Sequence, residues 1–203
     1  MSAKGLSKQV IVNQAIKYIA ETEKSEISLR EVARRLGVKA PSLYNHIKNT
    51  EELQYAVYQH AIDLFVQNQQ AATSGKTQDD AIKVFAEAYH TFAIENKGLY
   101  QVIMSIPSEE DETGKEIALP LLKTVVFILS DYGLPEESIA HWQRVFRAIL
   151  HGFVSQEYLG YFYFYRDVDL KKSRDIALQC FLDGLHAEKK NGTQRDLTVK
   201  GVN

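Results

Sequence analysis

The chain has 203 residues, 45% of them hydrophobic, which is enough for a packed core in one or two domains. No stretch approaches the ~20 consecutive apolar residues of a membrane span, and the first residues lack an apolar signal region, so we expect a cytoplasmic protein. A single cysteine excludes an internal disulfide framework. The net charge of −2 hides an asymmetry: residues 1–60 carry nine Lys or Arg against six Asp or Glu, and residues 61–203 carry fifteen against twenty. A basic end on an acidic body suits a protein that binds a polyanion at one end only.

Apolar residues recur at helical spacing along the whole chain, which predicts an all-α fold. Ser7 can cap the first helix, and Val12, Ala15 and Ile19 form part of its inward face. Pro120 is expected to kink or restart its helix. The expected helices cover 7–23, 28–36, a short one from 39, 50–72, 77–96, 99–105 with a stop at Pro107, 115–132, 135–161 and 170–190, with loops at 73–77 and 108–114 and a flexible tail at 191–203.

The segment from Ser28 to Asn49 predicts two short helices joined by a tight turn. Ser28 and Glu31 have the spacing of a capping box, in which each side chain accepts the other residue's backbone N–H. Gly37 stands where a left-handed residue ends the first helix, because glycine has no Cβ to clash. Pro41 stands in the first turn of the second helix, where a missing N–H costs nothing. This is the pattern of a helix-turn-helix, whose second helix lies in the DNA major groove.

The side chains of this segment fit DNA binding. Leu43 and Ile47 are four residues apart and are expected to pack inward, which turns polar neighbours outward. Phosphate contacts would then set the position, while a few side chains read base edges. The alternative is a pair of short helices of any all-α protein with an ordinary solvated basic face. The expected cations are Arg30, Arg34, Arg35, Lys39 and Lys48, and the other expected DNA-binding residues are Ala40, Pro41, Ser42, Tyr44, Asn45 and His46.

Residues 36–49, Leu-Gly-Val-Lys-Ala-Pro-Ser-Leu-Tyr-Asn-His-Ile-Lys-Asn, followed by Thr-Glu-Glu-Leu at 50–53, resemble the signature of the TetR family of transcriptional regulators. The resemblance matches Leu43 and Tyr44 to the family's Leu-Tyr pair and His46 to its histidine. Thr50 stands where a phosphate-binding lysine is common, so that contact is either lost or made by Lys48. The resemblance implies an N-terminal three-helix DNA-binding head, expected at 1–50, and a helical ligand-binding and dimerisation body, expected at 51–190.

The last two expected helices are rich in large apolar and aromatic side chains. In a chain of this size they are covered only if they pack on each other and on a second copy; the alternative is that both belong to the core of a monomer. In the family the last two helices form a two-fold four-helix interface, so the resemblance implies a homodimer. Residues 147–162 resemble a C-terminal domain variant named for a Trp, a His and a Gly, with Arg147 at the usual Trp position.

The resemblance also implies a pocket for an unidentified small-molecule effector. Pockets are mostly apolar with a few placed polar groups. His90, Gln143, Arg147 and His151 are therefore candidates for orienting the effector, and each could instead be an ordinary polar residue of the core or surface. Aromatic walls favour a flat or hydrophobic effector. The other expected lining residues are Tyr89, Phe92, Tyr100, Met104, Phe127, Trp142 and Phe146.

Enzymatic and metal-binding interpretations find little support. The six histidines are scattered without H-x-x-H or H-E-x-x-H spacing, so we expect no enzymatic activity, no metal and no cofactor. The sequence predicts a ligand-responsive transcriptional repressor that binds a palindromic operator in double-stranded DNA as a homodimer. The competing interpretation is a helical ligand-binding or protein-interaction module whose motif does not bind DNA.

Overall fold

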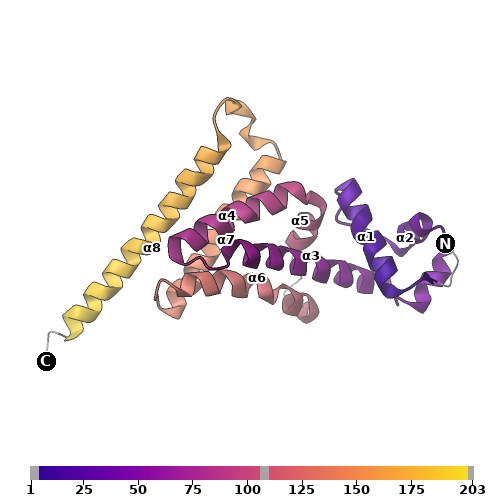
Figure 1. The fold of residues 1–203 in the computed structure, drawn as a ribbon, viewed down its shortest axis with the longest axis horizontal. Helices are drawn as coiled ribbons and strands as arrows, with labels where there is room; N and C mark the ends of the chain where they lie inside the picture. Colours follow the sequence, from indigo (N-terminus) through magenta and orange to yellow (C-terminus); the bar gives the residue numbers. More distant parts are fainter. Residues whose placement is uncertain (1–4, 106–109, 201–203) are drawn as a thin grey trace. The chain divides into compact units, whose positions relative to one another are not determined.

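The computed structural model describes residues 5–105 and 110–200, with residues 191–200 described only as helical backbone. Every regular element in this part of the chain is a helix, which confirms the all-α expectation (Figure 1). The elements are α1 (Lys8–Thr22), α2 (Leu29–Leu36), the 3-10 helix η2 (Ala40–Asn45), α3 (Thr50–Thr73), α4 (Gln78–Glu95), α5 (Lys97–Met104), α6 (Glu112–Ser130), α7 (Glu136–Tyr158), the 3-10 helix η3 (Tyr161–Tyr165) and α8 (Leu170–Lys200).

Three boundaries in the second half differ from the expected ones. α6 already begins at Glu112 and continues through Pro120 as one helix, since a proline removes only one backbone donor. α7 ends at Tyr158, before the expected Tyr161, and Gly160 takes a left-handed φ of 70° ahead of η3. α8 continues to Lys200, beyond the expected end at 190. The expected stop at Pro107 and residues 108–109 of the expected loop lie outside the described residues.

The chain divides into two compact units. Unit 1 comprises residues 1–68 and 91–121, and unit 2 comprises residues 69–90 and 122–203. α3, α4 and α6 each contribute residues to both units, so the boundaries fall inside helices. The division into a head of residues 1–50 and a body of residues 51–190 is a functional one and stays a prediction.

In unit 1, α1 packs against both α2 and α5. Ser7 caps α1 by accepting the N–H of Val10 at 3.3 Å, as expected, and the buried face of the helix includes Ala15 and Ile19. At Gly98 of α5 the two helices approach so closely that a Cβ would lie 2.4 Å from the backbone oxygen of Ile19. Only glycine allows this approach, which holds α1 on α5.

In unit 2, α7 packs against α8 (Figure 1). Phe146 of α7 stacks on Phe181 of α8, with ring centroids 4.9 Å apart, and Trp142 meets the same ring edge-on at 5.3 Å. The Trp142 indole also donates to the carboxylate of Glu188, and its ring lies against Gly184. These aromatic side chains therefore form the core between the last two helices.

Candidate functional site

The turn of the helix-turn-helix forms as the sequence predicts. Ser28 caps α2, its hydroxyl accepting the N–H of Glu31 at 3.3 Å. Gly37 ends the helix with a left-handed φ of 67°, and its N–H reaches the carbonyls of Ala33 and Arg34. The chain is thus turned sharply between α2 and η2.

The second half of the expected capping box is wrong. Instead of reaching back to the N–H of Ser28, the Glu31 carboxylate accepts from Arg34 at 2.9 and 2.6 Å and from Arg35 at 3.2 Å. Arg35 also donates to Glu21 at 2.6 Å, and its guanidinium lies 4.5 Å from the centre of the Tyr18 ring. Two of the expected phosphate-binding cations therefore hold α1 and α2 together.

This cluster makes the stability of the protein depend on pH. The Arg34 hydrogen bond, followed by that of Arg35, lowers the pKa of Glu31 from 4.5 to about 2. A carboxylate with a lowered pKa contributes stability that is complete above its unfolded pKa, near 4.5, and is lost as the pH falls towards 2. We expect Glu31→Gln to flatten this dependence.

Urea unfolding between pH 2 and pH 7 measures this effect. The matched control is Glu116→Gln, which changes an exposed carboxylate of α6 outside the cluster. Wild type and control should lose stability on acidification more steeply than Glu31→Gln. Identical slopes for all three proteins would show that the cluster contributes nothing.

The second helix of the motif is a 3-10 helix rather than the α-helix usual at this place. It occupies only Ala40–Asn45, has Pro41 in its first turn and ends where the N–H of His46 reaches the carbonyl of Leu43. Leu43 and Ile47 are buried, as expected, and anchor it from below. Around this anchor, Arg30, Lys39, Pro41, Tyr44, Asn45 and Lys48 are exposed, and Ala40, Ser42 and His46 are half-buried.

A capping arrangement that the sequence analysis did not single out fixes the exit from the motif. Asn49 accepts the N–H of Glu52 at 2.8 Å and so caps α3. The Glu52 carboxylate accepts the N–H of Lys48 at 2.8 Å and also binds the ammonium of Lys8, which lowers the pKa of Glu52. The Asn-x-x-Glu spacing of residues 49–52 was the available signal. It joins α1, the motif and α3 at one point.

Unit 2 contains a cavity of about 500 Å³ between α4, α7 and α8. Its walls are largely apolar, with a few charged side chains, which is the usual character of a small-molecule site. The lining residues are Lys83, Val84, Ala86, Glu87, Tyr89, His90, Ile149, Leu150, Phe153, Val154, Lys171, Arg174, Asp175 and Leu178.

A polar cluster lies at this cavity. The Nε2 atom of His90 is 2.8 Å from the Glu157 carboxylate and 2.8 Å from the Arg174 guanidinium. Arginine only donates, so Nε2 accepts from Arg174 when it carries no proton and donates to Glu157 when it carries one. The cluster therefore has two hydrogen-bond arrangements, one for each tautomer or protonation state of His90.

Comparison with known proteins identifies the family. Residues 82–181 match a family model described as the tetracyclin repressor-like C-terminal domain. Over 156 residues the chain is 32% identical to an HTH-type transcriptional regulator of Mycobacterium tuberculosis, covering 76% of this chain and 72% of that protein. The chain belongs to the TetR family of transcriptional regulators.

Other TetR-like proteins extend the likeness over nearly the whole chain. The regulator YobS of Bacillus subtilis is 27% identical over 191 residues, which cover 92% of this chain and 96% of that one. The fold of the TetR-family protein ActR of Streptomyces coelicolor, solved in complex with (S)-DNPA, superposes with a TM-score of 0.63 at 15% identity, covering 90% of this chain and 98% of that one. Mycobacterium smegmatis BioQ superposes with a TM-score of 0.63 at 22% identity, covering 90% and 99%.

As a TetR-family member, the chain is a DNA-binding transcriptional regulator, and unit 1 carries its helix-turn-helix. The family consists of transcriptional regulators, which are generally not enzymes. Among the helices that the structure describes, none is both long enough and apolar enough to cross a membrane.

The structure brings Tyr89 and His90 to the cavity of unit 2 and places the other expected ligand residues of this TetR-family protein elsewhere. Phe92 and Tyr100 are core residues of unit 1, where Phe92 meets Phe65 edge-on, and Met104 is half-buried in α5. In unit 2, Phe127 is 72% exposed, and Trp142, Gln143 and Phe146 lie in or beside the α7–α8 core. Arg147 and His151 lie on the exposed face of α7.

The charged residues that α8 adds to the cavity were not expected from the sequence. Lys171, Arg174 and Leu178 recur at helical spacing, so their shared face could be inferred. What the spacing does not show is that this face lies opposite Lys83 and Glu87 of α4.

Proposed function

We propose that this TetR-family protein is a ligand-responsive repressor that binds a palindromic operator as a homodimer. The observation that carries the DNA-binding part is the surface around η2. Lys39, Tyr44, Asn45 and Lys48 are exposed there, on a segment held rigidly by Leu43, by Gly37 and by the Asn49 cap. Lysine side chains suit phosphate contacts, and an exposed asparagine suits an adenine edge.

The homodimer is proposed to form through α7 and α8. Val145 of α7 is 44% exposed and Ile176 of α8 is 58% exposed, and Cys180, one turn beyond Ile176, is exposed as well. Apolar side chains on both helices favour coverage by a second copy. Two heads would then be spaced about 34–36 Å apart, one turn of DNA, and read two half-sites. Light scattering tests this: a mass of two chains is expected, and a monomer at micromolar concentration would contradict it.

The effector is proposed to bind in the cavity between α4, α7 and α8. Its apolar walls suit a hydrophobic or flat molecule, and His90 and Arg174 offer polar groups that could orient it. An effector controls DNA binding only if it has different affinities for the two spacings of the heads. A coupling free energy of ~1–3 kcal/mol is typical.

α3 is the proposed link between effector and DNA. Its first residues are capped at the motif, and its last residues, Gln69–Thr73, belong to unit 2. Gln69 is fully buried, and with its amide oriented to satisfy both groups it donates to the carbonyl of Phe85 and accepts the N–H of Tyr89, each at 3.2 Å. Tyr89 lines the cavity. An effector that displaces α4 there would therefore move α3.

Filling the cavity tests its role as a binding site. Ala86 is a small lining residue of α4, so Ala86→Phe is expected to occupy part of the volume. The probe is 1-anilinonaphthalene-8-sulfonate, an apolar anion whose fluorescence rises on binding. We expect its affinity to fall about tenfold or more in Ala86→Phe, roughly 1.4 kcal/mol.

The control is Ala71→Phe, which adds the same ring at an exposed position of α3 away from the lining residues. It should bind the dye as wild type does. Equal binding by both variants would place the dye outside the cavity and contradict this proposal.

A further inference from the structure

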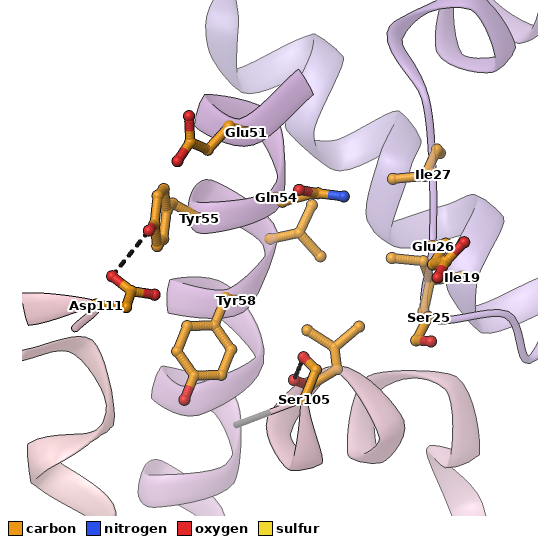
Figure 2. Close-up of a pocket in the computed structure, with 12 residues that line it drawn as sticks. Ile19, Ser25, Glu26, Ile27, Glu51, Gln54, Tyr55, Tyr58, Ser105 and Asp111 are labelled. Atoms are coloured by element: carbon orange, nitrogen blue, oxygen red, sulfur yellow. Dashed lines mark hydrogen bonds between the residues drawn. The ribbon is translucent and has the colours of Figure 1, made fainter. Parts of the chain in front are cut away.

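Unit 1 contains a second cavity, of about 440 Å³, made of other residues than the effector cavity (Figure 2). Its walls come from the end of α1 and the segment after it, from the first turns of α3, and from the end of α5 with Asp111. Ile19, Val57 and Val102 give it an apolar part, and the tyrosines Tyr55 and Tyr58 of α3 give it aromatic walls.

The charged groups of this cavity are all acidic. Glu26 follows α1, Glu51 lies in the first turn of α3, and Asp111 precedes α6; no Lys, Arg or His is among the described lining residues. Neither Glu26 nor Glu51 forms an ion pair with a residue that the structure describes. Asp111 accepts the hydroxyl of Tyr55 at 2.8 Å and the N–H of Gly114 at 2.8 Å, both neutral donors (Figure 2). Three carboxylates thus share one cavity without a counter-ion from its walls.

The carboxylates are spread over the cavity rather than gathered at one point. Among the described residues, no group of three or more His, Cys, Asp or Glu side chains is arranged to hold a metal ion. In Figure 2, Glu51 and Asp111 lie on the α3 side and Glu26 on the α1 side, with the tyrosines between. This spacing suits a larger cation, whose apolar part contacts Tyr55 and Tyr58 and whose charge is attracted by carboxylates and aromatic faces.

We propose that this cavity binds an organic cation, such as an amine or quaternary ammonium compound with an apolar group. The site goes beyond the proposed effector cavity, which has basic as well as acidic side chains. A cation bound here contacts α1, the α1–α2 segment and α3, the elements that hold the helix-turn-helix. It therefore offers a second input to the DNA-binding unit.

Isothermal titration with benzyltrimethylammonium tests the proposal, with benzyl alcohol and benzoate as neutral and anionic analogues. We expect saturable binding of one cation per chain, binding about tenfold or more weaker for the alcohol, and none for benzoate. The double variant Glu26→Gln with Glu51→Gln should weaken cation binding about tenfold or more. A double variant with the same charge change at exposed positions elsewhere, Asp80→Asn with Glu116→Gln, should not.

The outcomes separate clearly. Absence of cation binding, equal binding of cation and alcohol, or equal effects of the two double variants would each overturn the proposal. If the test variant melts early, Glu26→Gln alone carries the same comparison, because Glu26 lies outside the helices. The titration involves no DNA, so its failure would leave the proposed repressor function standing.

Discussion

Replacing Lys39 and Lys48 together with alanine is expected to weaken binding to every duplex, whatever its sequence. Both side chains are exposed beside η2, where they can neutralise phosphates. Each lost charge-assisted contact reduces affinity about tenfold or more. Each also removes released counterions, so the slope of log K against log salt should become shallower by about two for the pair. Fluorescence anisotropy over a range of salt concentrations measures both quantities.

The charge-matched control is Lys76→Ala with Lys123→Ala, two exposed lysines outside the motif. It should leave affinity and slope as in wild type. Asn45→Ala offers the opposite contrast, since loss of a base contact should change the preferred sequence and leave the salt slope unchanged. A slope that does not distinguish the lysine pair from its control would mean that phosphates are not bound at this surface.

Gly98→Ala is expected to lower the free energy of unfolding by about 1–3 kcal/mol, the usual effect of an overpacked contact. Its Cβ would lie 2.4 Å from the backbone oxygen of Ile19 and 2.9 Å from that residue's Cγ2. A side chain can rotate away, but the backbone oxygen moves only if α1 and α5 separate. Urea denaturation measures the loss.

Gln101→Ala is the control on the same helix, because Gln101 is exposed. It should change stability by no more than about 0.5 kcal/mol. If Gly98→Ala is as stable as this control, then α1 does not pack on α5 as closely as described. Because α1 is also tied to the motif through Lys8 and Glu52, Gly98→Ala should in addition weaken operator binding.

Local chemistry allowed the helix-turn-helix to be predicted closely. Ser28, Gly37, Leu43 and Ile47 each act through neighbours a few residues away, and the structure finds all four in their expected roles. The return bond of Glu31 was wrong because Arg34 and Arg35, one turn further along the helix, provide charged donors for the same carboxylate. A charged hydrogen bond is stronger than one to a neutral backbone N–H.

The cavities were harder to predict, because they depend on which helix faces meet. Phe146 and Trp142 were reasonable lining candidates as large apolar residues, but their rings fill the space between α7 and α8. Lys171 and Arg174 reach the cavity from a helix about 80 residues further along the chain than α4, a contact that periodicity cannot show. The acidic cavity of unit 1 likewise combines segments far apart in sequence.

Selection of DNA by the wild-type protein from a pool of randomised duplexes tests the central claim most directly. A homodimeric reader with one helix-turn-helix per chain should enrich two inverted half-sites about one helical turn apart. Enrichment of such a palindrome is the predicted result. A pool that keeps its random composition through repeated rounds would contradict the account and favour a helical module that does not read DNA.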